Sequence, residues 1–482
     1  MLDIIPAAAH ALSSLVFAEI EIFQVRFPLI VIWLASAMLF FTIRLKCINI
    51  RGFAFAVGIL LGRHREKDAP GEMSHFQALS TALSGTLGLG NIAGVAIGIA
   101  MGGPGAVFWM IVGGLFAMSL KFAEVLLAVK YRTILSNGRY SGGPMWMLRN
   151  GLAARGMPRL GKILGMIYAI FALFAFIQVV QVNQSYSQIR IVLGLGGGME
   201  PALIYGLVIA GATAIVLIGG VAVLARVTSR LVPVMCAFYM LGIAIILVLH
   251  ADKIPSTLLL IVTEAFAPTA VAGGFLATMV VGLRRAAFSN EAGIGPAAIA
   301  HAVAKTREPA SEGFVALLEP FLDTVVICTA TALAILVTGS WRLGYNDIAM
   351  TSAAFETAGS WFPALLAIAV CLFAFSTILA VGYYGLQVWA YLVGPSKWKD
   401  RAYLIFFCAT LPIGALVDVS TVTNLADSFF FLLAVPNIIG LYILSGEVRD
   451  DGERYFAARR DIGRVDTTGP AALPAWPRRA SD

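Results

Sequence analysis

Eleven stretches of about 20 mostly apolar residues follow one another along the chain, and each can cross a bilayer as a helix. Hydrophobic side chains make up 59% of the 482 residues and charged ones only 13%, which leaves far more apolar surface than a water-soluble core of this size can bury. The sequence predicts an all-α integral membrane protein with about eleven transmembrane helices. They are expected at residues 27–46, 74–101, 105–131, 162–190, 201–220, 231–250, 273–303, 312–339, 362–391, 402–418 and 425–446.

Glycine-rich interruptions occur in two of these stretches, half a chain apart. The first lies in LSGTLGLGNIAGVAIGIAMGGPG (83–105), with its polar residues at 84–91, and the second is FSNEAGIGPAAIA (288–300). Residues 88–93 and 293–298 share the pattern G-[LI]-G-[NP]-x-A at a distance of 205 residues. Such a pair of interruptions is typical of secondary transporters built from two inverted repeats, which bind substrate where the broken helices meet.

This repeat predicts the organisation of the chain. We expect a leading region with one extra helix at 1–72, a first five-helix repeat at 73–250, a second at 251–446 and a disordered cytoplasmic tail at 447–482. Each repeat begins with a discontinuous helix.

The chemistry of a broken helix suits a zwitterion and a cation. The free N–H groups of a half-helix bind a carboxylate, and freed carbonyls bind an ammonium group or a metal ion. For the first break alone, close helix packing explains the glycines equally well, and Gly94, Gly98 and Gly102, spaced by four, are expected to serve packing. The second break adds charged and polar residues, which favours a binding site.

The motifs at these positions resemble the alanine or glycine:cation symporter family, a branch of the transporters with the leucine-transporter fold. The similarity covers about residues 74–390. The resemblance implies secondary active transport, in which a small neutral amino acid of the alanine and glycine class moves with sodium by alternating access. The matching segments are SGTLGLGNIAGVA, GGPGAVFWM, KFAEVLLAVKYR, YSGGPMWML, QVNQS, FSNEAGIGPAAIAHAVAKT, LEPFLDTVVICTATAL and FAFSTILAVGYYG.

The resemblance also implies a sodium site between the first broken helix and the eighth helix of the ten-helix core. Its ligands would be the carbonyls of Ser84, Leu87 and Phe373 and the hydroxyls of Ser376 and Thr377. Neutral oxygens suit a hard monovalent cation. The alternative for the two hydroxyls is a bond to the carbonyl four residues earlier in their own helix.

A second cation position, present in some relatives, would use the Thr86 carbonyl, Asn91 and Ser289.

For the substrate, the resemblance places the carboxylate on the N–H groups of Gly88, Leu89 and Gly90, with Gln181 reaching in from a neighbouring helix. The ammonium group would meet Thr86 and the freed carbonyls near Ser289, and Phe288 would close the pocket. Gln181 could instead make a hydrogen bond between helices.

Four residues depart from the family pattern. Pro296 stands where the family usually has Ser, and Leu386 stands where Glu is common. Leu89 stands where the family usually has Thr, and Val381 stands where it has a Trp that caps a very small pocket. We therefore expect a pocket that accepts neutral side chains larger than that of alanine.

Lys and Arg in the loops predict the orientation. Loops 44–72 and 130–162 are rich in both, which places them in the cytoplasm, the N-terminus outside and the C-terminus inside a plasma (inner) membrane. The net charge of +7 thus reflects topology, and nothing indicates nucleic-acid binding or an obligate protein partner. The expected partners are a small neutral amino acid, the coupling ion Na⁺ and the lipid bilayer.

Charged residues inside the apolar stretches need an explanation of their own. Lys121 and Glu124, three residues apart, are expected to pair. Glu291, Glu319 and Asp323 would anchor the second break, with Arg284 or Arg285 as partners, or one of them would carry a proton.

The sequence lacks a nucleophile–base or metal-binding constellation, so an enzyme is not expected. A proton-coupled amino-acid symporter and a transporter-derived sensor remain alternatives.

Overall fold

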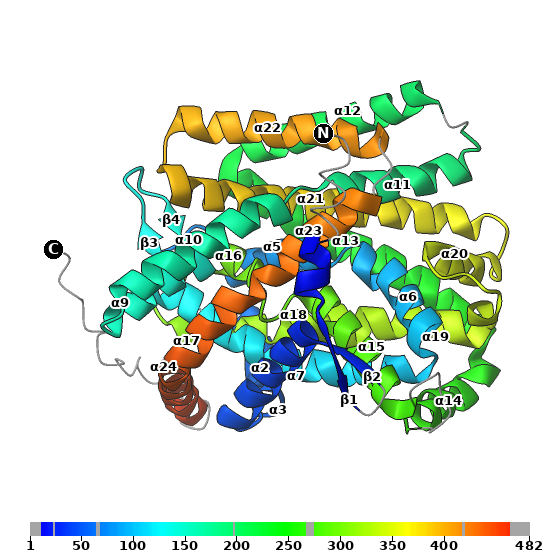
Figure 1. Ribbon diagram of the computed structural model, residues 1–482, viewed down its shortest axis with the longest axis horizontal. Helices are drawn as coiled ribbons and strands as arrows, with labels where there is room; N and C mark the ends of the chain where they lie inside the picture. Colours follow the sequence, from blue (N-terminus) through cyan, green and yellow to red (C-terminus); the bar gives the residue numbers. More distant parts are fainter. Residues whose placement is uncertain are drawn as a thin grey trace.

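The computed structural model describes residues 11–22, 25–63, 68–195, 198–266, 274–416 and 420–462. Within these residues the chain is almost entirely helical (Figure 1). The predicted tail at 463–482 and the start of the chain at 1–10 lie outside the described residues.

Seven helices in the described part of the chain are long and apolar enough to cross a membrane, and a bent pair adds an eighth. The chain is therefore an all-α membrane protein, as expected. The pair is His75–Thr86 with Leu89–Gly102, bent by 66°. The seven are Gly105–Lys130 (α7), Pro158–Val192 (α10 and α11), Met199–Ile218 (α12), Gly220–Leu249 (α13), Pro309–Thr338 (α17 to α19), Phe362–Val393 (α21) and Ala426–Arg459 in α23 and α24.

The remaining elements are shorter or carry more charge. They are β1 (Glu19–Ile22), β2 (Val25–Pro28), α2 (Leu29–Arg44), α3 (Ile48–Arg51), α4 (Phe53–Leu60), α5 (His75–Thr86), α6 (Ala93–Gly102), β3 (Thr133–Ile134), β4 (Tyr140–Ser141), α8 (Pro144–Trp146), α9 (Leu152–Ala154), α14 (Ile254–Phe266), α15 (Gly274–Asn290), α16 (Ala297–His301), α20 (Ile348–Glu356) and α22 (Lys397–Leu416). The bounds of the composite spans are α10 Pro158–Ala175, α11 Val179–Val192, α17 Pro309–Ala316, α18 Leu318–Pro320, α19 Thr329–Thr338, α23 Ser420–Leu432 and α24 Ala434–Ile462.

Both predicted helix breaks are present. The first separates α5 from α6 and contains a short 3₁₀ turn, Leu89–Asn91. The second separates α15 from α16, where Glu291, Gly293 and Gly295 have φ values of 56°, 90° and 99°. Glycine adopts such positive φ values without steric cost, which explains two of the three residues.

Helices that are distant in sequence pack around the breaks. α5 packs against α13, α16 and α21, and α15 packs along α7. α12 and α22 lie side by side along one edge of the molecule (Figure 1). The two breaks are therefore enclosed by protein, which is where non-helical backbone is tolerated at membrane depth.

The beginning of the predicted tail is helical rather than disordered. α24 continues to Ile462, well past the expected end at residue 446. Lys130 Nζ lies 2.6 Å from Glu447 Oε2 and 2.8 Å from Asp451 Oδ2, and Tyr455 is only 2% exposed. Composition suggested a disordered tail, but these contacts with α7 and the core stabilise the helix.

Candidate functional site

The first break lies against α21. α5 ends at Thr86, and the extended residues Leu87 and Gly88 lead into the 3₁₀ turn. A Cβ atom on Gly88 would lie 3.0 Å from Thr377 Oγ1, which is tighter than an ordinary contact. The approach of the two segments therefore depends on the absence of a side chain at Gly88.

The five residues proposed to bind sodium meet at this approach. Ser84 Oγ lies 2.6 Å from Ser376 Oγ and donates to the Ser376 carbonyl at 2.7 Å. Thr377 Oγ1 lies 3.3 Å from the Leu87 carbonyl across the break and 3.0 Å from the Phe373 carbonyl in its own helix. Both the cross-helix contact and the alternative bond within the helix are thus present at Thr377.

The second predicted cation position contains a carboxylate that sequence analysis did not assign to it. Asn91 Nδ2 donates to Asp323 Oδ1 at 2.6 Å, and Ser289 Oγ donates to Asp323 Oδ2 at 2.5 Å. Thr324 donates to the same Oδ2 atom at 2.7 Å. Asp323 lies in the π-helical stretch Phe321–Cys328, a distortion that often occurs at functional sites. The charge in an apolar span signalled its importance, but only the fold shows its partners.

One expectation about the first break is wrong. The Gly88 N–H donates to Asn91 Oδ1 at 3.0 Å, so it is not free to bind a substrate carboxylate in this structure. The Asn91 side-chain amide thus accepts a hydrogen bond from Gly88 with its oxygen and donates one to Asp323 with its nitrogen. This bridge connects the first break to the span Pro309–Thr338.

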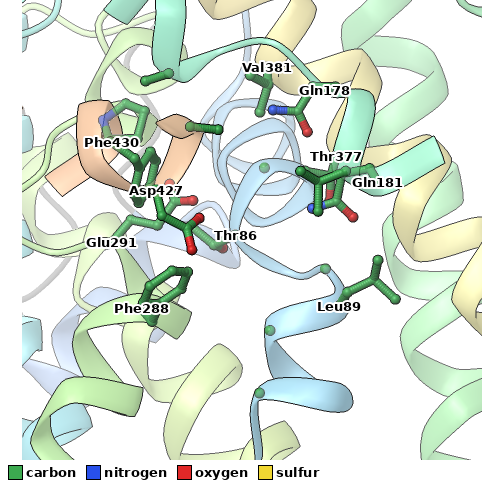
Figure 2. Close-up of a pocket in the computed structure, with 18 of the residues that line it drawn as sticks. Thr86, Leu89, Gln178, Gln181, Phe288, Glu291, Thr377, Val381, Asp427 and Phe430 are labelled. Atoms are coloured by element: carbon green, nitrogen blue, oxygen red, sulfur yellow. The ribbon is translucent and has the colours of Figure 1, made fainter. Parts of the chain in front are cut away.

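A cavity of about 350 Å³ lies where the two breaks face each other. Such a volume is in the range of small-molecule sites. Figure 2 shows Phe288, Glu291, Asp427 and Phe430 on one side of Thr86, and Gln178, Gln181, Thr377 and Val381 on the other. Leu89, Gly88 and Gly90 complete the set of predicted substrate residues that line the cavity, whereas Ser289 does not line it.

Five buried polar side-chain atoms of residues that line this cavity have no hydrogen-bond partner among the described residues: Thr86 Oγ1, Gln178 Oε1, Gln181 Oε1 and the Nε atoms of Arg284 and Arg285. A buried polar atom without a partner costs free energy, so their shared position indicates a polar ligand. For Gln181 this favours binding over a hydrogen bond between helices. Gln178 was not predicted, because nothing in the sequence marks its position.

Phe288 forms an aromatic wall of the cavity. Its ring centroid lies 4.9 Å from that of Phe431, and the Arg285 guanidinium carbon lies 5.6 Å from the Phe288 centroid. Phe288 thus lines the cavity, and its closing of the pocket over a substrate stays a prediction.

One expected ion pair differs in the structure. Lys121 Nζ pairs with Glu319 Oε1 at 3.1 Å, and Glu124 instead accepts hydrogen bonds from the Gly293 N–H at 2.9 Å and from Asn437 Nδ2 at 2.7 Å. The spacing of three residues allowed a Lys121–Glu124 pair, but contacts with other spans replace it. Glu124 therefore anchors the second break, a role that sequence analysis gave to other acidic residues.

The expected packing glycines also divide into two groups. A Cβ on Gly98 would lie 3.1 Å from Arg285 Cγ, and one on Gly102 would lie 2.8 Å from Ala106 Cβ, so both serve close packing. A Cβ on Gly94 would meet nothing within 4 Å, and Gly94 lines the cavity.

Comparison with known sequences identifies one family over nearly the whole chain. The sequence model described as the sodium:alanine symporter family matches residues 10–467. The sodium/alanine symporter AgcS of Methanococcus maripaludis is 37% identical over 439 residues, 90% of this chain and 95% of the relative. The probable sodium/glutamine symporter GlnT of Bacillus subtilis is 33% identical over 447 residues, 92% of this chain and 89% of the relative.

Solved structures share the fold at low sequence identity. The structure of MhsT in complex with L-phenylalanine superposes with a TM-score of 0.53 at 13% identity, covering 80% of this chain and 93% of that one. A manganese transporter of Eremococcus coleocola gives 0.51 at 12% identity, covering 78% and 82%. These similarities concern the fold alone.

Proposed function

Because the chain belongs to the sodium:alanine symporter family, we propose that it carries out sodium-coupled symport of a neutral amino acid by alternating access. The named relatives are transporters or symporters rather than enzymes. The observation that carries the proposal is the meeting of the α5–α6 break with α21 beside a cavity lined by both breaks.

The sodium ion is proposed to lie among the oxygens of Ser84, Leu87, Phe373, Ser376 and Thr377. In support, Ser84 Oγ contacts Ser376, and Thr377 Oγ1 contacts the Leu87 and Phe373 carbonyls, so ion binding would exchange these internal bonds for ion contacts. The site is neutral and buried, which suits a monovalent cation better than a divalent one, because a monovalent ion costs less to dehydrate.

A second cation position is proposed at Asn91, Ser289 and the Thr86 carbonyl. The Asp323 carboxylate supports it, because a buried negative charge in an apolar span needs a positive counter-charge.

The amino acid is proposed to lie in the cavity, with its carboxylate on the N–H groups of Leu89 and Gly90 and on Gln181. Its ammonium group would contact Thr86 and the C-terminal carbonyls of α15 near Ser289, where the helix dipole is negative. Phe288, Leu89 and Val381 would form the walls. The unpartnered Thr86 Oγ1, which can accept a hydrogen bond from the ammonium group, supports this placement, and Gln181 would donate to the carboxylate through Nε2.

The architecture and orientation belong to the same proposal. We expect eleven spans in the membrane, with repeats at 73–250 and 251–446 after a leading helix. The N-terminus would lie outside and the C-terminus in the cytoplasm of an inner membrane. The supporting observations are the two interrupted helices and the Lys- and Arg-rich loops.

Counterflow tests the function directly. Purified protein is reconstituted into liposomes loaded with unlabelled neutral amino acids, and labelled amino acid is added outside. A carrier accumulates label transiently in exchange for the internal pool, whereas a sensor gives binding without accumulation. Repeating the assay in sodium-free buffer, with protons as the only available coupling ion, separates the sodium-coupled symporter from the proton-coupled alternative.

A further inference from the structure

The span Pro158–Val192 is interrupted at residues that line the cavity. α10 ends at Ala175 and α11 begins at Val179. Residues 175–178 all line the cavity. Non-helical backbone at membrane depth is tolerated only where protein buries it or where it borders a cavity. The interruption therefore shapes the binding cavity, although it contains no glycine or proline from which a helix break could be predicted.

Gln178 at this interruption has an unsatisfied carboxamide. Gln178 as a residue is 9% exposed, and Oε1 has no hydrogen-bond partner among the described residues. A carboxamide offers one acceptor atom and two donor hydrogens. A ligand group that both donates and accepts pairs with it in either orientation, whereas an apolar group leaves it unsatisfied.

Val381 places free space beside this carboxamide. Gln178 directly precedes α11, which packs against α21, and Figure 2 shows the Gln178 and Val381 side chains on the same side of Thr86. Val381 lies in α21 and is 7% exposed, and its isopropyl group is much smaller than an indole. A substrate side chain that extends toward Val381 therefore passes Gln178.

The charges around the cavity disfavour a charged side chain. Asp427 and Glu291 line the cavity together with Arg284 and Arg285 of α15, which are the electrostatic partners of Asp427, so the formal charges of the lining sum to zero. The Nε atoms of both arginines have no hydrogen-bond partner in the part of the chain that the structure describes. The wall thus carries both signs of charge. A neutral, dipolar side chain matches it better than a carboxylate or an ammonium group does.

We infer that Gln178 and Val381 form a subsite for a carboxamide, so that the preferred substrate is an amino acid with an amide side chain. This inference rests on the proposed function and narrows its substrate class. Hydrogen bonding to Gln178 supplies the selectivity, and the small Val381 supplies the room.

The test compares side chains of similar length. L-Glutamine, L-methionine and L-glutamate compete against a labelled neutral substrate in proteoliposomes, together with L-threonine as a short hydroxyl donor. Glutamine should compete at a concentration at least about tenfold lower than methionine, the ratio expected from one hydrogen bond that the apolar analogue leaves unmade. Gln178→Leu should bring the glutamine-to-methionine ratio close to one. Gln188→Leu, the same change at a buried residue of α11 outside the cavity, should preserve the wild-type ratio.

Ligand-induced thermal stabilisation of the detergent-purified wild-type protein gives the same ranking without transport and without a variant that could misfold. Equal ranking of glutamine and methionine in the wild type, while transport remains sodium-dependent, would overturn the subsite and leave the proposed function standing. A preference for glutamate or threonine over glutamine would overturn the carboxamide assignment. An unchanged ratio in folded Gln178→Leu protein would show that another residue sets the preference.

Discussion

Thr377→Val removes one proposed sodium ligand while it preserves the shape of the side chain. Thr377 is 4% exposed, and its Oγ1 lies 3.3 Å from the Leu87 carbonyl and 3.0 Å from the Phe373 carbonyl. Valine replaces this hydroxyl by a methyl group that cannot bind an ion. The expected effect is a weaker sodium affinity with an intact fold.

The magnitude follows from the contacts. Losing one neutral internal hydrogen bond costs folding about 0.5–1.5 kcal/mol, whereas a contact to a charged group contributes about 1.5–3 kcal/mol. Since about 1.4 kcal/mol corresponds to a factor of ten, the sodium concentration for half-maximal uptake should rise roughly 10- to 150-fold. Four of the five proposed ligand residues remain, so uptake should recover at high sodium.

The assay is substrate uptake into proteoliposomes over a range of external sodium concentrations, with sodium-dependent thermal stabilisation as a second readout. Thr331→Val is the matched control. Thr331 is fully buried in α19 and makes the same bond within its helix, to the Ile327 carbonyl at 3.0 Å, but its hydroxyl meets Tyr239 at 2.8 Å instead of the break. If both variants show the same sodium dependence as the wild type, Thr377 does not bind the ion.

Three further changes test the site and its support. Gly88→Leu should abolish substrate binding but leave a folded protein, because a Cβ at this position already lies 3.0 Å from Thr377 Oγ1 and a longer side chain would fill the site. Gly90→Ala is the control and should fold without strain, because nothing lies within 4 Å of its added Cβ. Wild-type ligand binding by Gly88→Leu would contradict the proposed site. Val381→Trp should shift competition toward alanine and glycine, since a pocket wall rejects larger side chains by overlap, and an unchanged substrate profile would place the wall elsewhere. Glu319→Ala should lower the free energy of unfolding by about 3–5 kcal/mol, because it removes the carboxylate that lies 3.1 Å from the buried Lys121 ammonium group. An unchanged melting temperature would show that this ion pair contributes little to stability.

The features that the sequence predicted are those with a local signal. Clusters of glycine and polar residues in apolar stretches marked both breaks, because these residues interrupt helices wherever they lie. The contacts of Ser376 and Thr377 with the first break came from the family resemblance, and the structure brings these residues together.

The features that the sequence did not predict depend on partners from distant spans. The interruption at 176–178 contains no glycine or proline. Lys121 forms its ion pair with Glu319, nearly 200 residues away, rather than with Glu124 on its own helix. Asp323 was recognised as unusual, but its bonds to Asn91 and Ser289 follow from the packing of three spans. Spacing along one helix cannot select among such partners.

Sodium-driven accumulation by the purified protein tests the central claim most directly. Proteoliposomes that contain only this protein are given an inward sodium gradient, a proton gradient of equal size or no gradient, and the uptake of labelled neutral amino acid is followed over time. The proposed function predicts accumulation above equilibrium with the sodium gradient alone, which collapses when sodium is equalised by an ionophore. Accumulation driven fully by the proton gradient, or no accumulation in the presence of saturable binding, would contradict it.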